Sequence, residues 1–254
     1  MDFKKRDLDA IGIIPARMDS TRLPGKMLKE INGKPLVLHT YDNAKTSEHL
    51  RRIVIATDHE DIKSVCESAG AEVVMTRRDL PSGTDRIHWA YKELEESADV
   101  VVNIQGDEPL LSGKIIDELF WPFSTSLSQV GTLVKRIDNI DDVFDSSVVK
   151  VVLENDNTAL YFSRSPIPFV RDTHKNDWLK KQVFWKHIGV YAYRIEALEE
   201  FTNLPQTDLE ISESLEQLRL LQSNHKYLCV ETKEDLHGVD TQEDLDKLQQ
   251  ILSK

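Results

Sequence analysis

Short apolar runs alternate with segments of helical spacing through the first half of the chain. Four runs rich in Ile and Val favour strands, at 11–14, 52–57, 72–75 and 99–104. Between them, 34–48 and the segment after Asp58 place apolar residues three and four positions apart, which predicts helices. Strands that alternate with helices indicate an α/β fold with a parallel sheet. The continuous run 99–104 is expected at the centre of that sheet.

The pattern changes in the third quarter, where strand-like segments follow one another with few helices between them. These segments are 130–136, 147–154, 159–162 and 184–193. The turn residues 154–157 predict a hairpin, so 150–162 is expected to be antiparallel. We interpret the region of about 130–195 as an extension of the sheet with an excursion suited to dimer contact. The charged segment 169–181 predicts a mobile loop.

Helical spacing returns near the end of the chain. The segment 208–221 predicts one helix with its leucines inward, and 226–231 predicts a last strand. A terminal helix follows Asp240 and Thr241. Either residue can serve as its N-cap, with Glu243 or Asp244 closing a capping box.

Composition narrows the class of protein. The chain has 254 residues, 40% hydrophobic and 30% charged, which suits one large domain or two small ones. A net charge of −12 argues against nucleic acid or an anionic membrane as the main partner. The two cysteines, Cys66 and Cys229, lack metal-ligand spacing and are interpreted as reduced core residues. Without an apolar signal core or a membrane span, a cytoplasmic protein is expected.

A polar segment directly follows the first predicted strand. It carries Arg17, Ser20, Arg22 and Lys26, together with Pro24 and Gly25, which shape a loop rather than a helix. Ligands bind at the carboxyl ends of strands in open α/β sheets, and fixed cations there suit a triphosphate. Neither a Walker-type loop nor a G-x-G-x-x-G fingerprint occurs in the sequence. Phosphate binding is therefore expected to rely on side chains.

A second polar loop, 76–86, contains Arg77, Ser82 and Gly83. Gly83 would let the backbone approach a ligand closely. Capping of the following helix explains Ser82 and Thr84 equally well, and the pattern leaves both interpretations open.

The central predicted strand runs into Gln105-Gly106-Asp107-Glu108-Pro109. A carboxylate just past a buried strand, near a basic loop, favours a divalent metal shared with phosphate oxygens, held here by Asp107. The alternative is a simple turn, because these residues are also good turn formers.

Several other polar residues have no decisive pattern of their own. Arg164 ends a strand, and His187 lies within one, where a lone histidine is often a satisfied core group. Glu213, Glu216 and Gln217 fall on a helix face that could simply be solvated.

A resemblance to a known family emerges from the motifs taken together. The strings IIPARMDSTRLPGK, MTRRDLPSGTDR, VNIQGDEP, ALYFSRSPIP, HIGVYAYR and GVDTQEDL resemble, in this order, the 3-deoxy-manno-octulosonate (Kdo) cytidylyltransferases of the sugar nucleotidyltransferase superfamily. The resemblance covers about residues 10–250. It implies a single Rossmann-like domain with a mixed, mainly parallel sheet flanked by helices, and a β-rich dimerisation region at about 130–195.

The resemblance also implies an activity and a set of sites. CTP and Kdo would give CMP-Kdo and pyrophosphate with Mg²⁺, for lipopolysaccharide biosynthesis, in a cytoplasmic homodimer. It assigns catalysis to Arg17, Arg22, Lys26 and Asp107; nucleotide binding to Arg17, Ser20, Arg22, Lys26, Arg77, Ser82, Gly83 and Gln105; sugar binding to Arg164, His187, Glu213, Glu216 and Gln217; and metal binding to Asp107 and Asp240.

Two alternatives stay open. The substrate could be another acidic sugar, such as a sialic-acid-like sugar or 8-amino-Kdo, because the nucleotide loop is shared across that group. The second alternative is a homologue that binds nucleotides without catalysing a reaction. The presence of both Asp107 and Asp240 argues against this alternative. The approach to Asp240, TKEDLHGVD, is charged where relatives are often glycine-rich, which bears on how this aspartate is positioned.

Overall fold

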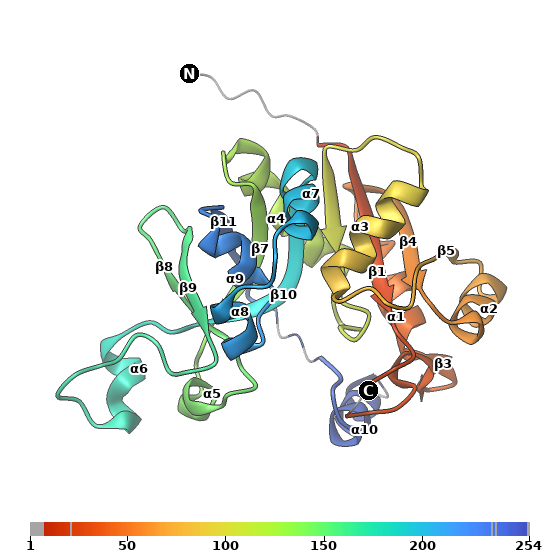
Figure 1. Ribbon diagram of the computed structural model, residues 1–254. Helices are drawn as coiled ribbons and strands as arrows, with labels where there is room; N and C mark the ends of the chain where they lie inside the picture. Colours follow the sequence, from red (N-terminus) through yellow and green to blue (C-terminus); the bar gives the residue numbers. More distant parts are fainter. Residues whose placement is uncertain (1–7, 21, 235, 237, 253–254) are drawn as a thin grey trace.

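The fold is built around one large mixed sheet with helices on both faces (Figure 1). The computed structural model describes residues 8–20, 22–234, 236 and 238–252. The strand order is β11-β7-β10-β6-β1-β4-β5, and β8 and β9 form a hairpin off this path. The strands are β1 (Ala10–Ala16), β4 (Leu50–Thr57), β5 (Glu72–Met75), β6 (Val100–Asn103), β7 (Val130–Arg136), β8 (Lys150–Leu153), β9 (Ala159–Ser163), β10 (Trp185–Arg194) and β11 (Tyr227–Glu231), with a small separate pair β2 (Glu30–Ile31) and β3 (Lys34–Pro35).

The predicted parallel core is confirmed. β1 pairs in parallel with β4 and β6, and β4 pairs in parallel with β5. β11 is parallel to β7, whereas β10 is antiparallel to β6, β7 and β8. The predicted hairpin is also confirmed, since β8 and β9 pair antiparallel. A mixed, mainly parallel sheet is therefore the framework that positions the loops.

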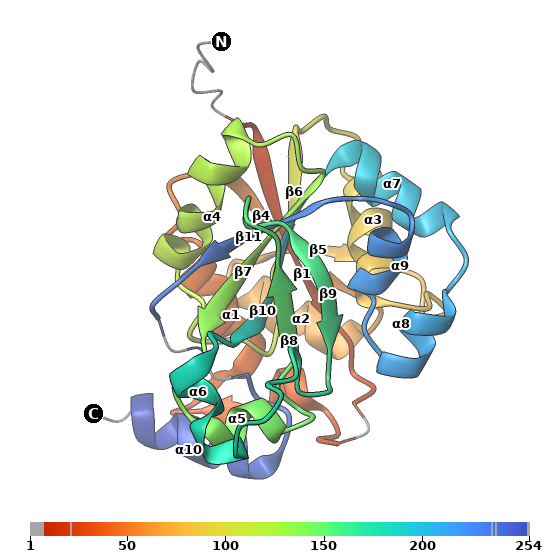
Figure 2. The same cartoon turned by 90° about the vertical axis from the view of Figure 1, so that its left-hand side faces the viewer.

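Two hydrophobic clusters cover the two faces of the sheet. Successive residues of β1 alternate between them, with Ile11 and Ile13 on one face and Ala10 and Ile14 on the other. Figure 2 shows α4 on one side of the sheet and α3 and α7 on the other. The helices are α1 (Leu36–Ala44), α2 (Glu60–Ser68), α3 (Gly83–Glu93), α4 (Gly113–Thr125), α5 (Ile140–Phe144), α6 (Trp178–Lys181), α7 (Ile195–Asn203), α8 (Asp208–Glu213), α9 (Gln217–Gln222) and α10 (Gln242–Leu252), with 3-10 turns η1 (Lys26–Leu28) and η2 (Lys175–Asp177).

Two sequence predictions are wrong in their local structure. The single helix at 208–221 is interrupted, because Ser214 adopts a left-handed conformation (φ 52°) between α8 and α9. The segment 169–181 contains η2 and α6 and is anchored by Trp178, which is only 2% exposed and stacks on Phe184. A buried indole therefore orders part of a segment whose charge predicts a loop.

The prediction that the two cysteines are core residues is confirmed. Cys66 and Cys229 are both buried free thiols. Within the described ranges, the longest apolar helices fall short of what would be needed to cross a bilayer.

Candidate active site at the carboxyl ends of β1 and β6

Three segments far apart in sequence meet beyond the carboxyl ends of β1 and β6. The loop after β1 leads into η1, the loop after β6 holds Asp107, and the segment before α10 holds Asp240. The backbone N–H of Val239 donates to the carbonyl of Asp107 at 2.9 Å. Val239 is fully buried in a small cluster with Leu23, so α10 is fixed against the first loop. This packing brings residues of all three segments together.

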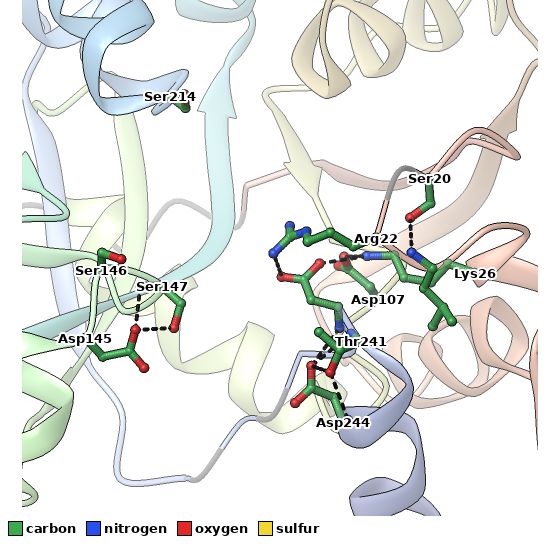
Figure 3. A network of polar contacts seen from close by, with 12 residues as sticks. Ser20, Arg22, Lys26, Asp107, Asp145, Ser146, Ser147, Ser214, Thr241 and Asp244 are labelled. Atoms are coloured by element: carbon green, nitrogen blue, oxygen red, sulfur yellow. Dashed lines mark hydrogen bonds and ion pairs between the residues drawn. The ribbon is translucent and has the colours of Figure 1, made fainter.

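Two carboxylates and two cations form the centre of the site (Figure 3). The ammonium of Lys26 lies 2.5 Å from Asp107 Oδ2 and 3.1 Å from Asp240 Oδ1. Arg22 pairs with the other oxygen of Asp240 at 3.0 Å. Burial alone would lower the pKa of Lys26. The charges and hydrogen bonds of Asp107 and Asp240 together outweigh burial, so the pKa of Lys26 is raised. The structure thus brings together four of the predicted site residues, which are Arg22, Lys26, Asp107 and Asp240.

The N-cap question at α10 is resolved by these contacts. The Thr241 hydroxyl accepts from the N–H of Asp244 at 3.2 Å, and Asp244 Oδ2 accepts from the N–H of Thr241 at 2.9 Å. Thr241 therefore caps the helix, which leaves the Asp240 side chain for the cations. A turn does form at Asp107, because the N–H of Glu108 donates to the carbonyl of Gln105 at 3.1 Å, and this turn leaves the Asp107 side chain free to face Lys26.

Glu108 is a third acid at this centre. Burial, together with Asp107 and Asp240, raises the pKa of Glu108 to about 8. Its Oε2 is buried without a hydrogen-bond partner among the described residues. A Cβ on Gly238 would lie 2.8 Å from Glu108 Oε1, so a larger residue there would require the Glu108 carboxyl to shift.

The donor set suits a hard cation. Carboxylate oxygens from Asp107 and Asp240 converge on one position, which the positively charged Lys26 ammonium reaches. In the part of the chain that the structure describes, no group of three His, Cys, Asp or Glu side chains could hold a metal. A divalent cation here would thus have two protein carboxylates and take its other ligands from phosphate oxygens or water, as Mg²⁺ commonly does.

The rest of the first loop is partly organised. Gly25 has φ 67°, a left-handed conformation that turns the chain into η1 and aims Lys26 at the carboxylates. The Ser20 hydroxyl accepts from the N–H of Leu23 at 3.4 Å. Arg17 stays exposed at the end of β1.

The second polar loop shows the capping that the sequence left open. Ser82 is the N-cap of α3, and its hydroxyl accepts from the N–H of Asp85 at 3.1 Å. Glu216 reaches the same helix end and accepts from the Thr84 hydroxyl at 2.8 Å and from the N–H of Gly83 at 3.4 Å. Glu216, which directly precedes α9, thereby joins the connection between α8 and α9 to the second loop.

The Arg77 side chain contacts Asp79 of its own loop and Trp89 of α3. Its Nε donates to Asp79 at 2.9 Å, and its guanidinium lies 5.5 Å from the ring centroid of Trp89. Gln105 donates to Asn103 at 3.2 Å.

Arg164 and Glu213 form a connected pair rather than a solvated face. Glu213 accepts from the Ser163 hydroxyl at 2.6 Å and from the N–H of Arg164 at 2.9 Å. The Arg164 guanidinium donates to the carbonyls of Glu213 at 2.8 Å and Ser146 at 3.0 Å. Figure 3 shows Ser146 and Ser214 across from the group formed by Arg22, Lys26 and Asp107. The Arg164 guanidinium also donates to the carbonyl of Ser214 at 3.4 Å, so Arg164 contacts both of these serines.

His187 and Gln217 have largely buried side chains with few polar partners. Nε2 of His187 lies 2.9 Å from the Thr132 hydroxyl, and the ring packs edge-on against Phe162. This supports the core interpretation of His187. Gln217 is 3% exposed, and its Nε2 is buried without a hydrogen-bond partner among the described residues.

The environment of His187 gives a testable dependence of stability on pH. Burial lowers the pKa of His187 to about 3. In the unfolded chain His187 is protonated below pH ~6.5, whereas in the folded protein it stays neutral down to its lowered pKa. The free energy of unfolding therefore decreases as the pH falls from ~6.5 toward the folded pKa. This loss amounts to at most ~1.4 kcal/mol per pH unit. We expect the free energy of unfolding of His187→Gln to fall less steeply than that of the wild type between pH ~6.5 and ~4.5 in urea titrations. Equal slopes would show that His187 is not desolvated.

Comparison with known proteins identifies the family. The cytidylyltransferase family model matches residues 11–230. The chain belongs to the cytidylyltransferase family. Curated relatives named 3-deoxy-manno-octulosonate cytidylyltransferase agree with this. The protein from Parabacteroides distasonis is 44% identical over 241 residues, covering 93% of this chain and 95% of the relative. The protein from Thermodesulfovibrio yellowstonii is 42% identical over 250 residues, covering 96% and 98%.

Solved structures extend the comparison to the fold of this cytidylyltransferase. A CMP:2-keto-3-deoxy-manno-octonic acid synthetase complexed with CTP superposes with a TM-score of 0.88 and 36% identity, covering 96% of this chain and 98% of that one. A cytidylyltransferase from Leptospira borgpetersenii has a TM-score of 0.63 at 16% identity, which shows the shared fold. The resemblance inferred from the motifs is confirmed, and so is the nucleotidyltransferase class.

Three buried polar residues of this cytidylyltransferase were not singled out by sequence reasoning. Glu108 follows Asp107 directly, and that adjacency was its only signal. Arg86 is fully buried and donates to Asp58 at 2.9 Å beneath the second loop. Lys150 is fully buried, and its ammonium donates to the carbonyls of Asp145, Val148 and Arg164 at 2.6–2.7 Å. A lysine in a strand carries no sequence signal for such a role.

Proposed function

We propose that this cytidylyltransferase transfers CMP from CTP to the anomeric hydroxyl of Kdo, releasing pyrophosphate, as a step of lipopolysaccharide biosynthesis. The observation that carries the proposal is the meeting of Arg22 and Lys26 with Asp107 and Asp240 at the carboxyl ends of β1 and β6. This cluster lies in a chain 42–44% identical to Kdo cytidylyltransferases over nearly its full length. Phosphoryl transfer of this kind depends on positioning and charge neutralisation, which this cluster is equipped to supply.

The nucleotide side is assigned to the two polar loops. Arg22 and Lys26 bind the β- and γ-phosphates and stabilise the charge that develops on the leaving pyrophosphate. Arg17, exposed at the mouth of the first loop, completes the set of cations around the triphosphate. The remaining proposed contacts to ribose, base and phosphate come from Ser20, Arg77, Ser82, Gly83 and Gln105.

Magnesium is the proposed cofactor, with Asp107 and Asp240 as its protein ligands. When bound, it supplies Lewis-acid stabilisation of phosphate charge and lowers the pKa of a coordinated hydroxyl. Asp107 and Asp240 would hold the cation, and Lys26 would bind the phosphates.

The sugar side is assigned to the pair of Arg164 and Glu213 and to the residues behind it. Arg164 has N–H groups beyond those that bind the carbonyls, and these suit the carboxylate of an acidic sugar. His187, Glu216 and Gln217 complete the proposed pocket. Since the buried amide of Gln217 lacks a protein partner among the described residues, a sugar hydroxyl is a fitting acceptor for it.

We also propose a homodimer with its interface in the β-rich region of about 130–195. The hairpin β8–β9 lies at the far end of the molecule from β5 (Figure 1). Leu160 on β9 is 52% exposed, which suits an apolar contact with a second copy.

The proposed function predicts Mg²⁺-dependent release of pyrophosphate from CTP and Kdo by the purified protein. The measurement is a coupled pyrophosphate assay with Kdo, 8-amino-Kdo and a sialic acid in parallel, each with and without Mg²⁺. Release with Kdo is the expected result. Release with another acidic sugar alone would move the pocket assignment, and CTP binding without release for any sugar would establish the non-catalytic alternative.

A further inference from the structure

The ammonium of Lys26 occupies the point where the two proposed metal ligands converge. It lies 2.5 Å from Asp107 Oδ2 and 3.1 Å from Asp240 Oδ1, and its side chain is only 9% exposed. The carboxylates of Asp107 and Asp240 are 25% and 43% exposed, so they remain open to small ions. The backbone of Lys26 is fixed by hydrogen bonds with Leu23 and Lys29, both at 3.1 Å. The lysine is therefore directed at the carboxylates by the local fold.

This arrangement neutralises the carboxylates without any other cation. Arg22 takes the second oxygen of Asp240 at 3.0 Å, so two positive side chains balance two negative ones. A divalent ion that coordinates Asp107 and Asp240 would share these oxygens with the ammonium. Two cations held at one carboxylate pair repel each other strongly in a partly buried site.

The ligand count adds a second reason for competition. Among the described residues, no third acidic, His or Cys side chain completes a metal cage around Asp107 and Asp240. A divalent ion at two carboxylates gains too few protein ligands to displace a buried ammonium easily. A nucleoside triphosphate favours the divalent ion in two ways. Its oxygens supply further ligands to the ion, and they offer the Lys26 ammonium another anionic partner.

We propose that Lys26 determines which cation occupies the carboxylate pair of Asp107 and Asp240, and that a divalent ion binds there tightly only when a triphosphate has drawn the ammonium away. This inference rests on the proposed function, since it adopts the same two aspartates as metal ligands. The nucleotide and the divalent ion then enter together and strengthen each other's binding. The same lysine thus serves as internal counter-ion before the nucleotide binds and as phosphate ligand afterwards.

The test is a titration of the nucleotide-free protein with Mn²⁺. The electron paramagnetic resonance signal of the unbound ion reports how much Mn²⁺ is free. Lys26→Met removes the ammonium and keeps an unbranched side chain only one atom shorter, and Lys26→Gln is a second neutral replacement. Both variants are expected to bind Mn²⁺ with a dissociation constant at least about tenfold smaller than that of the wild type. Lys34→Met is the matched control, because Lys34 pairs with Asp42 at 2.5 Å outside the site. Its affinity for Mn²⁺ is expected to equal that of the wild type.

A double variant separates failure of this inference from failure of the proposed metal site. In Lys26→Met/Asp107→Asn the gained affinity is expected to disappear. If both neutral variants bind Mn²⁺ no more tightly than the wild type, the competition by Lys26 is refuted, and the metal assignment is then judged by the activity of Asp107→Asn alone. If the gain persists in the double variant, the ion binds elsewhere, and both the inference and the metal assignment fail.

Discussion

Replacing Asp107 by asparagine is expected to lower turnover by at least about a thousandfold. Asparagine keeps the shape of the side chain but removes the charge that faces Lys26 at 2.5 Å and that is proposed to hold the cation. Loss of a metal ligand removes several kcal/mol of charge stabilisation in the transition state, and a thousandfold corresponds to ~4 kcal/mol. Initial rates of pyrophosphate release at saturating CTP and Kdo measure the effect.

The fold of the Asp107→Asn variant is expected to survive. When the charge of Asp107 is removed, Lys26 keeps its ion pair with Asp240 at 3.1 Å, so its ammonium is not left unpaired. The backbone contact that joins the loops, from the N–H of Val239 to the carbonyl of residue 107, does not depend on the side chain. Thermal unfolding should therefore change little.

Asp117→Asn is the matched control for the Asp107 variant. Asp117 also accepts tight hydrogen bonds, from the Ser47 hydroxyl at 2.5 Å and the N–H of Glu48 at 2.9 Å, but it lies on α4 outside the site. Its replacement is expected to leave turnover unchanged. Wild-type turnover in Asp107→Asn would place the cation elsewhere, and an equal loss in both variants would indicate a general structural effect.

The cluster around Lys26 was accessible from sequence because one rule of α/β architecture places it. Apolar runs identify β1 and β6, and parallel neighbours end at the same edge of the sheet. Charged residues directly after those runs must then lie close together. Asp240 could not be placed this way, since its approach depends on the packing of α10 through Val239 against the first loop.

The break at Ser214 shows what periodicity cannot reveal. Leucines at 215, 218 and 221 continue the helical spacing, so the local pattern favours one helix. The carbonyl of Glu213 instead accepts from Arg164, and Glu216 turns toward the first turn of α3. These partners lie 49 and 133 positions away in sequence, beyond the reach of any local pattern. The same limit explains why the capping contact of Ser82 and the packing of His187 became visible only in three dimensions.

Replacing Glu210 by glutamine is expected to destabilise the protein by about 3–5 kcal/mol, because it leaves a buried arginine charge unpaired. Glu210 and Arg219 are 3% and 2% exposed and form a two-point ion pair at 2.5 and 2.8 Å. Arg219 also lies 3.9 Å from the ring centroid of Phe201. The loss would be a large share of a typical stability of about 5–15 kcal/mol. Urea unfolding followed by tryptophan fluorescence measures it.

Two further variants separate the buried pair from an ordinary surface contact. Asp177→Asn breaks an exposed pair with Lys180 at 2.7 Å and is expected to produce no resolvable change. Glu210→Gln/Arg219→Met removes both charges and should recover part of the loss, since the single variant suffers mainly from the unpaired charge. A Glu210→Gln variant as stable as the wild type would show that Arg219 finds another partner. This pair joins α8, which ends at Glu213, to α9, which follows Glu216. Its strength therefore also fixes the proposed sugar side relative to the second loop.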